Sequence, residues 1–213
     1  MRVSPARARL LPASAENMEI AAAILDAGGL VAFPTETLYG LGADARNENA
    51  VLKVYQAKAR PPDKPLIILV QDIQEAGRYG ELSEDAIRLA DAFWPGALTL
   101  IFERREASPL ARALNPVGNT VALRAPGSDI AMRLLRIFSA PLTAPSANPA
   151  GATPPTTAEA VMQNMAGAID AVLDGGPCPG NESTLLDVST SPPRLLREGA
   201  ISRRRIEDIL GPL

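Results

Sequence analysis

Short apolar runs and longer segments of helical periodicity alternate along the chain. The apolar runs predict strands over residues 30–33, 66–70, 98–103, 120–124, 142–144, 169–173, 184–188 and 194–196. Residues 39–45 read as extended or turning. The segments of helical type are 16–27, 47–58, 83–93, 128–138, 157–165 and 202–210. This interleaving predicts an α/β or mixed α+β protein in which helices cover one sheet.

Several of the predicted helices carry recognisable start and stop residues. Ser14 is a candidate N-cap for the first helix, and Gly28-Gly29 follows its end. Ser128 is a candidate N-cap for the helix over 128–138, with Asp129 favourably placed in its first turn. These signals place the helix boundaries within a few residues.

The 213 residues suit a single domain with a substantial core. We find no internal repeat and no linker long enough to divide the chain, so we expect one domain over residues 1–213, with its core at about 10–210. The arginine-rich N-terminus, residues 1–14, lacks the apolar segment of a signal peptide and is expected to be a solvated arm leading into a first strand.

Composition excludes several kinds of chemistry. The chain has no histidine, which removes Ser-His-Asp and Cys-His nucleophiles and histidine zinc sites. Cys178 is the one cysteine, so no intramolecular disulfide forms, and a single thiol fits a cytoplasmic protein. The net charge of −3 disfavours wholesale nucleic-acid binding, and no apolar run approaches the roughly 20 residues that span a bilayer.

The stretch 30–70 is the most informative segment. A strand ends in Pro-Thr-Glu-Thr, a Gly-Leu-Gly turn and a helix follow, and Lys58-Ala59-Arg60 precedes a second buried strand. Cations at the entry to a strand lie near the sheet edge, where α/β proteins bind ligands, so Lys58, Arg60 and Lys64 predict a site for a small anion. They would equally suit a solvated helix C-terminus, where cations complement the helix dipole.

Three other strand ends repeat this arrangement. Ser146-Ala147-Asn148 lies between two prolines after one apolar run, Ser183-Thr184 begins another, and Arg197 ends a third. Each alone is an ordinary turn or surface residue. Together, in a chain without histidine, they favour binding of a polyanion and a small polar substrate.

Gly40 and Gly42 begin a loose G-x-G-x-x-A dinucleotide fingerprint. Six residues separate the preceding strand from the glycines, and no acid follows at the required distance, so the context of a Rossmann motif is missing. Glycines needed for close backbone packing are the simpler interpretation.

Seven blocks in this order resemble the YrdC-like threonylcarbamoyl-adenylate synthase family: FPTETLYGLGADA, KARPPDKPLIILV, WPGALT, TVALRAPG, APSANPAG, STLLDVS and LLREGAIS. The resemblance covers about residues 10–210 and is closest to the short, single-domain form. It implies a twisted mixed sheet flanked by helices, with a large concave cleft. It also implies a nucleotidyltransferase that converts L-threonine, bicarbonate and ATP into threonylcarbamoyl-AMP, pyrophosphate and water, for N6-threonylcarbamoyladenosine modification of tRNA.

The resemblance also implies roles for individual residues. L-threonine would be bound by Thr37, Arg124, Ala144 and Ser183. ATP would be bound by Lys58, Arg60, Lys64, Thr120, Ser146, Asn148 and Arg197. Lys58 and Arg60 are the predicted catalytic cations, and as helix-end residues outside the core they should be removable without loss of the fold. Many relatives have a histidine where this chain has Leu69, so one threonine contact is missing or replaced.

The same resemblance sets expectations for cofactors and partners. Mg²⁺ would arrive with ATP, and no tightly bound metal is expected. The product would pass to a tRNA threonylcarbamoyl transferase complex, and weak binding of tRNA or double-stranded RNA is a further expectation. Three alternatives stay open: a carbamoyl-transfer domain of hydrogenase maturation, a non-catalytic RNA-binding module using the same basic cleft, and a Rossmann-like oxidoreductase.

Overall fold

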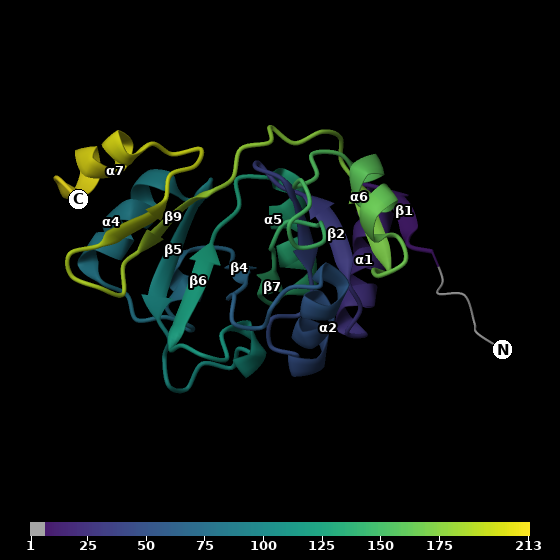
Figure 1. Ribbon diagram of the computed structural model, residues 1–213, viewed down its shortest axis with the longest axis horizontal. Helices are drawn as coiled ribbons and strands as arrows, with labels where there is room; N and C mark the ends of the chain where they lie inside the picture. Colours follow the sequence, from purple (N-terminus) through teal and green to yellow (C-terminus); the bar gives the residue numbers. More distant parts are fainter. Residues whose placement is uncertain (1–6) are drawn as a thin grey trace.

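The structure is a computed structural model that describes residues 7–213 (Figure 1). Its helices are α1 (Ala15–Asp26), α2 (Glu48–Lys58), α3 (Ile73–Ala76), α4 (Glu84–Phe93), the 3-10 turn η1 (Arg112–Leu114), α5 (Asp129–Phe138), α6 (Ala158–Met165) and α7 (Arg203–Leu210). Its strands are β1 (Arg9–Pro12), β2 (Val31–Pro34), β3 (Tyr39–Gly42), β4 (Ile67–Leu69), β5 (Leu98–Glu103), β6 (Thr120–Arg124), β7 (Leu142–Thr143), β8 (Ala171–Asp174), β9 (Thr184–Asp187) and β10 (Arg194–Arg197).

The strands form two mixed sheets. One has the order β1-β8-β2-β3, and the other has the order β10-β9-β5-β6-β4-β7. The prediction of a single sheet is therefore wrong, although isolated bridges from Gly40 to Ser146 and from Asp44 to Leu142 link the edge strand β3 to the region of β7. The two sheets thus meet edge to edge, and the predicted mixed α/β class is confirmed.

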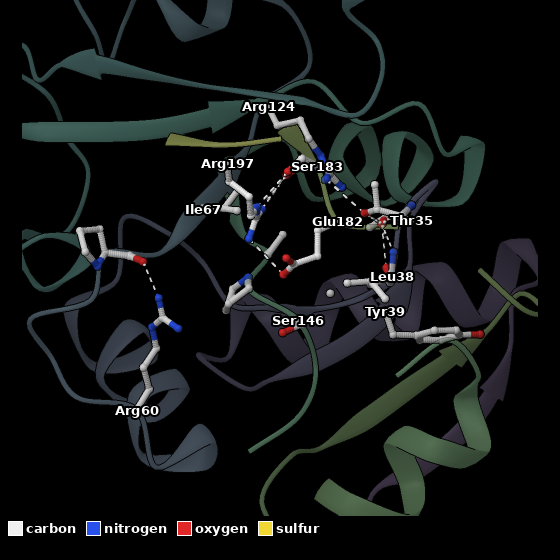
Figure 2. A pocket seen from close by; sticks show the side chains of 15 residues that line it. Thr35, Leu38, Tyr39, Arg60, Ile67, Arg124, Ser146, Glu182, Ser183 and Arg197 are labelled. Atoms are coloured by element: carbon white, nitrogen blue, oxygen red, sulfur yellow. Dashed lines mark hydrogen bonds and ion pairs between the residues drawn. The ribbon is translucent and has the colours of Figure 1, made fainter. Parts of the chain in front are cut away.

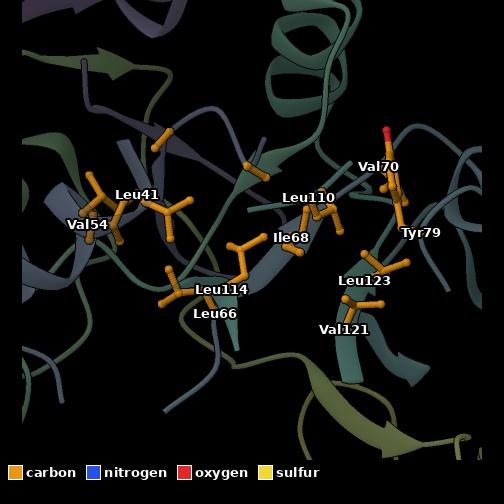
Figure 3. Close-up of a cluster of buried hydrophobic side chains, with 14 of the residues drawn as sticks. Leu41, Val54, Leu66, Ile68, Val70, Tyr79, Leu110, Leu114, Val121 and Leu123 are labelled. Carbon is orange, nitrogen blue, oxygen red and sulfur yellow. The ribbon is translucent and has the colours of Figure 1, made fainter. Parts of the chain in front are cut away.

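One continuous apolar core runs beneath both sheets. Leu41 of β3 and Val54 of α2 belong to the same buried cluster as Ile68 of β4 and Leu123 of β6 (Figure 3). A second cluster packs α1 and α5 against the opposite face of β2 and includes Leu69. Burial of this aliphatic surface supplies most of the driving force for folding.

Local sequence signals account for the helix ends. The Ser14 hydroxyl accepts a hydrogen bond from Asn17 N at 3.2 Å, and the Ser128 hydroxyl accepts one from Ala131 N at 3.3 Å, as their predicted N-cap roles require. The predicted helices and strands are all present within about two residues. The short elements α3 and η1 were not predicted, because they are too brief to show a periodicity.

The N-terminal arm is only partly described. Residues 1–6 of the predicted solvated arm lie outside the described residues. The following residues form β1, which pairs in parallel with β8 and buries Leu11, so this part of the expected arm is itself a strand. Within residues 7–213 no helix is both long and apolar enough to cross a membrane.

The topology brings distant strand ends to one place. β4 lies between β6 and β7, parallel to the first and antiparallel to the second. The segment that joins β8 to β9 crosses from one sheet to the other along the top of Figure 1. Residues just outside these strands therefore gather where the two sheets meet.

Candidate active site

A pocket lies at the junction of the two sheets and is lined from seven separate parts of the chain (Figure 2). Its lining residues are Thr35, Thr37, Leu38, Tyr39, Gly40, Arg60, Pro65, Ile67, Arg124, Ala144, Pro145, Ser146, Glu182, Ser183 and Arg197. Seven of the eleven predicted ATP and threonine contacts come together here: Thr37, Arg60, Arg124, Ala144, Ser146, Ser183 and Arg197.

Arg124, the last residue of β6, is the most deeply buried cation of the pocket, with 4% of the residue exposed. Its Nη1 donates to Thr37 Oγ1 at 3.2 Å, and its Nε lies 3.5 Å from Glu36 Oε1 without forming a hydrogen bond. Burial lowers the pKa of Arg124 from its ordinary value, Glu36 opposes this change, and Arg197 adds to it. A buried guanidinium with an unpartnered Nε is well suited to bind a carboxylate.

The turn after β2 presents two threonine hydroxyls to the pocket. Thr35 Oγ1 accepts hydrogen bonds from the backbone N–H groups of Thr37 and Leu38, and donates to Leu38 O at 2.7 Å. The two hydroxyls of Thr35 and Thr37 are 2.8 Å apart. The turn is therefore rigid, and Thr37 Oγ1 is held against Arg124.

Arg197, at the end of β10, is held by the backbone of a neighbouring segment. Its Nη2 and Nε donate to Ser183 O at 2.9 and 3.2 Å, and its Nη1 lies 3.0 Å from Glu182 Oε1. The Ser183 hydroxyl is 2.8 Å from Thr99 Oγ1. This arrangement fixes a cation, a carboxylate and a hydroxyl on one wall of the pocket.

Arg60 follows α2 and contributes the third guanidinium. Its Nε donates to Lys64 O at 3.1 Å, and its Nη2 donates to Pro65 O at 3.0 Å. Both acceptors are carbonyls, and within the described residues no carboxylate forms an ion pair with Arg60. Arg60 thus remains available to an anion that enters the pocket.

Lys58 does not line the pocket. It is 2% exposed, and its Nζ donates to Ser146 O and to Asn148 O, the latter at 2.6 Å. Burial, and secondarily Arg60, lowers the pKa of Lys58 from 10.5 to about 8. The expectation that Lys58 lies outside the core is wrong, because its side chain turns inward to satisfy two carbonyls of the 146–148 loop.

The 146–148 loop is supported from within. Asn148 is 4% exposed, and its Nδ2 donates to Pro149 O at 3.0 Å and to Ala152 O at 2.7 Å. Ser146 lines the pocket beside Ala144. Of the Ser-x-Asn pair, Ser146 faces the pocket while Asn148 shapes the loop that carries it.

Two other predicted ATP contacts stand apart from the pocket lining. Lys64 is exposed at its rim, next to the lining residue Pro65. Thr120 begins β6 and accepts a hydrogen bond from Asn115 Nδ2 at 3.0 Å. Thr120 and Arg124 are the two ends of β6, four positions apart, which corresponds to roughly 13 Å along a strand.

Two polar lining residues were not predicted from the sequence. Thr35 belongs to the same Pro-Thr-Glu-Thr turn as Thr37, and Glu182 immediately precedes Ser183. The signal that could have identified Thr35 and Glu182 was their position close to predicted site residues. The alternation of side chains in these segments could not be inferred, because both lie outside regular strands.

The glycines of the loose dinucleotide motif serve packing. Gly40 and Gly42 lie within β3, paired antiparallel to β2, and not in a turn between a strand and a helix. A Cβ added at Gly42 would lie 2.7 Å from Phe33 Cε1. The packing interpretation is confirmed, and the geometry of a Rossmann phosphate loop is absent from this segment.

The fold and the pocket together define a class of protein. Three guanidiniums and several hydroxyls converge at strand ends of a mixed α/β fold, which is an arrangement for binding anionic, hydroxyl-bearing molecules. Comparisons with known proteins identify the family to which the chain belongs.

The sequence model of the Sua5/YciO/YrdC family, described as telomere recombination, matches residues 23–199. A threonylcarbamoyl-AMP synthase of Bacillus subtilis is 45% identical over 91% of this chain and 56% of its own length. A putative threonylcarbamoyl-AMP synthase of Mycobacterium tuberculosis is 38% identical over 88% of this chain and 86% of its own. The crystal structure of Pyrococcus abyssi Sua5 complexed with L-threonine superposes with a TM-score of 0.91 at 40% identity, covering 97% of this chain and 61% of that one.

This chain belongs to the Sua5/YciO/YrdC family. The resemblance found in the sequence and the mixed α/β fold are thereby confirmed. The chain spans about half the length of the first curated relatives it matches, whose matched shares are 58%, 56% and 49%.

Proposed function

We propose that this chain is a threonylcarbamoyl-AMP synthase, which condenses L-threonine, bicarbonate and ATP into threonylcarbamoyl-AMP, pyrophosphate and water. The observation that carries the proposal is the convergence of Arg60, Arg124 and Arg197 with serine and threonine hydroxyls in one pocket. The relatives named threonylcarbamoyl-AMP synthase, and the related protein crystallised with L-threonine, support it.

The reaction has an electrostatic difficulty that such a pocket relieves. Threonine first gains a carboxyl group on its amine, with loss of water from bicarbonate. The carbamate oxygen then attacks the α-phosphorus of ATP and displaces pyrophosphate. Carbamate and triphosphate are both anions and repel each other, and fixed guanidiniums offset that repulsion and stabilise charge in the transition state.

The substrates would divide the pocket between them. Arg124, Thr37 and Ser183 suit the carboxylate and hydroxyl of threonine, because they combine a buried cation with hydroxyls held in place. Arg60, Ser146 and Arg197 suit the phosphates. Holding both reactants in line could contribute roughly 7–11 kcal/mol to catalysis. No protein nucleophile is needed, in keeping with a chain that lacks histidine.

Mg²⁺ would enter as part of the nucleotide substrate. Among residues 7–213 no group of three or more His, Cys, Asp or Glu side chains is placed to hold an ion. The phosphates and water would therefore provide most of the ligands, as is common for Mg²⁺ with ATP. The adenylate would then serve tRNA modification, by transfer to an enzyme that acts on adenosine.

The test is a product assay with purified protein, MgATP, threonine and ¹⁴C-bicarbonate. We expect pyrophosphate and a labelled adenylate, formed only when threonine and bicarbonate are both present. Pyrophosphate release that is indifferent to threonine would refute the assignment.

A further inference from the structure

One acidic residue lies in this cationic pocket, and none of the substrate contacts proposed for the pocket involves it. Among the described lining residues, Glu182 is the single carboxylate beside three arginines. Its side chain is 48% exposed, and Figure 2 shows its carboxylate toward the middle of the pocket, joined to Arg197. A negative charge at this position opposes the binding of a triphosphate, so its presence calls for a ligand group that benefits from it.

Holding Arg197 in place is an insufficient explanation. Arg197 already donates two hydrogen bonds to Ser183 O, at 2.9 and 3.2 Å, and therefore keeps its orientation without a carboxylate. The exposed ion pair with Glu182 adds little to this arrangement, since such pairs contribute about 0–1 kcal/mol.

The backbone of Glu182 is nevertheless closely fixed. Its carbonyl accepts a hydrogen bond from Ala200 N at 2.9 Å. A Cβ at Gly199 would lie 2.3 Å from the same carbonyl oxygen, so the two segments approach as closely as glycine allows. The carboxylate is thus carried by a rigid segment next to Ser183 and not by a free loop.

The amino-acid substrate of the proposed function provides the missing partner, and this inference rests on that function. Threonine enters as a zwitterion, and Arg124 is suited to its carboxylate. The ammonium group must leave water at the same time, which is unfavourable unless an opposite charge or good acceptors receive it. Glu182 is the one acidic residue in the described lining of the pocket, whereas Glu36, 3.5 Å from Arg124 Nε, does not line it.

We propose that Glu182 binds the α-ammonium group of the amino-acid substrate. The pocket then recognises the zwitterion by opposite charges, Arg124 for the carboxylate and Glu182 for the ammonium. It follows that Glu182 distinguishes an amino acid from the corresponding hydroxy acid, which a pocket made only of arginines and hydroxyls would not do.

The experiment measures binding by calorimetry for the wild type and for Glu182→Gln, which keeps the size of the side chain and removes its charge. The ligands are threonine, 3-hydroxybutanoate (the same acid without the amine) and MgATP. We expect Glu182→Gln to weaken threonine binding at least about tenfold, as for loss of a charge-assisted hydrogen bond. Binding of 3-hydroxybutanoate and of MgATP should be unchanged or tighter.

Two further variants complete the design. Glu106→Gln, at an exposed position in the turn after β5, is the matched control and should bind all three ligands like the wild type. Glu182→Asp keeps the charge and should restore part of the threonine affinity. Thermal unfolding of each variant checks that the fold is retained.

Other outcomes overturn the inference. Equal weakening of threonine and 3-hydroxybutanoate would mean that Glu182 acts on the shape of the pocket or on Arg197. A loss confined to MgATP would mean that the carboxylate serves the metal-nucleotide complex. If the wild type and Glu182→Gln bind threonine equally, this inference alone is refuted. If the wild type binds no threonine, both the proposed function and this inference are refuted.

Discussion

At the scale of single residues, Lys58 is a buried cation that supports a loop of the pocket and is absent from the pocket lining. Its Nζ bonds two carbonyls of the 146–148 loop, and its own carbonyl accepts a hydrogen bond from Ala150 N at 2.7 Å. Ser146 reaches the pocket on this loop. We therefore expect Lys58 to act as a positioning residue, whose effect on activity passes through the loop.

Burial of Lys58 predicts a particular dependence of stability on pH. Its pKa is about 8 in the folded protein and 10.5 for an ordinary lysine, so between these values the unfolded state binds more protons. The free energy of unfolding should therefore rise with pH across this interval, relative to the Lys58→Met variant, which cannot titrate. The gain should be on the order of 3 kcal/mol, since one pKa unit corresponds to about 1.4 kcal/mol.

Urea unfolding of both proteins from pH 7 to pH 10.5 measures this difference. Subtracting the variant removes the contribution of the buried tyrosines, whose pKa values are raised by burial in the folded protein. A difference that is flat or that declines with pH would show that Lys58 is not buried as described.

Arg60 should act directly on the anionic substrate. Its guanidinium bonds only carbonyls, so Arg60→Ala should lower kcat/KM at least about tenfold, by loss of charge-assisted bonds worth about 1.5–3 kcal/mol. Arg78→Ala removes an exposed arginine that does not line the pocket, and it should keep wild-type kinetics. Steady-state assays of both variants decide the point, and indistinguishable rates would make Arg60 a solvated surface charge.

At the scale of elements, β4 joins the core to the pocket. Ile67 lines the pocket, whereas Leu69 is fully buried in the cluster that also contains Phe33 and Leu142. Leu69 thus faces apolar side chains.

Leu69→Ala should consequently reduce stability and spare substrate recognition. Removing a buried leucine side chain costs about 2–5 kcal/mol in the free energy of unfolding. Leu52→Ala, on the exposed face of α2 at 43% exposure, should cost less than about 0.5 kcal/mol. Denaturant unfolding and the KM for threonine are the measurements. A KM that rises selectively for threonine, without loss of stability, would mean that Leu69 contacts the amino acid.

At the scale of the whole molecule, binding and activity assays distinguish the proposed enzyme from its alternatives. The net charge is −3, and the described cations of the site are gathered in one pocket. An RNA-binding module would shift RNA in a gel without nucleotide and with strong salt dependence. A hydrogenase-maturation domain would show carbamoyl transfer in place of adenylate synthesis, and an oxidoreductase would bind nicotinamide.

We expect the purified protein to contain no stoichiometric zinc, because the chain lacks histidine and has one cysteine. EDTA should nevertheless stop adenylate synthesis by removing the Mg²⁺ that accompanies ATP. Elemental analysis and the product assay test both parts. Zinc at one equivalent, or full activity in excess EDTA, would contradict this expectation, and added Mg²⁺ should restore the rate.

Much of the secondary structure follows from the sequence because its causes are local. A cap such as Ser128 requires only a backbone N–H three residues away, and strands such as β5 and β6 show as apolar runs. The candidate site was also largely predictable, because its cations and hydroxyls stand at strand ends. The family resemblance then assigned them to substrates.

What the sequence could not determine depends on neighbours far along the chain. The Lys58 side chain turns inward to donate hydrogen bonds to carbonyls 88 and 90 residues away. The sequence around Lys58 carries no signal of these distant acceptors. The division into two sheets and the place of Glu182 were likewise decided by tertiary pairing. Local sequence determined which elements form and where their polar ends lie. Tertiary structure alone decided which of those ends face one another, because burial and hydrogen bonding across the fold are set only when distant strands meet.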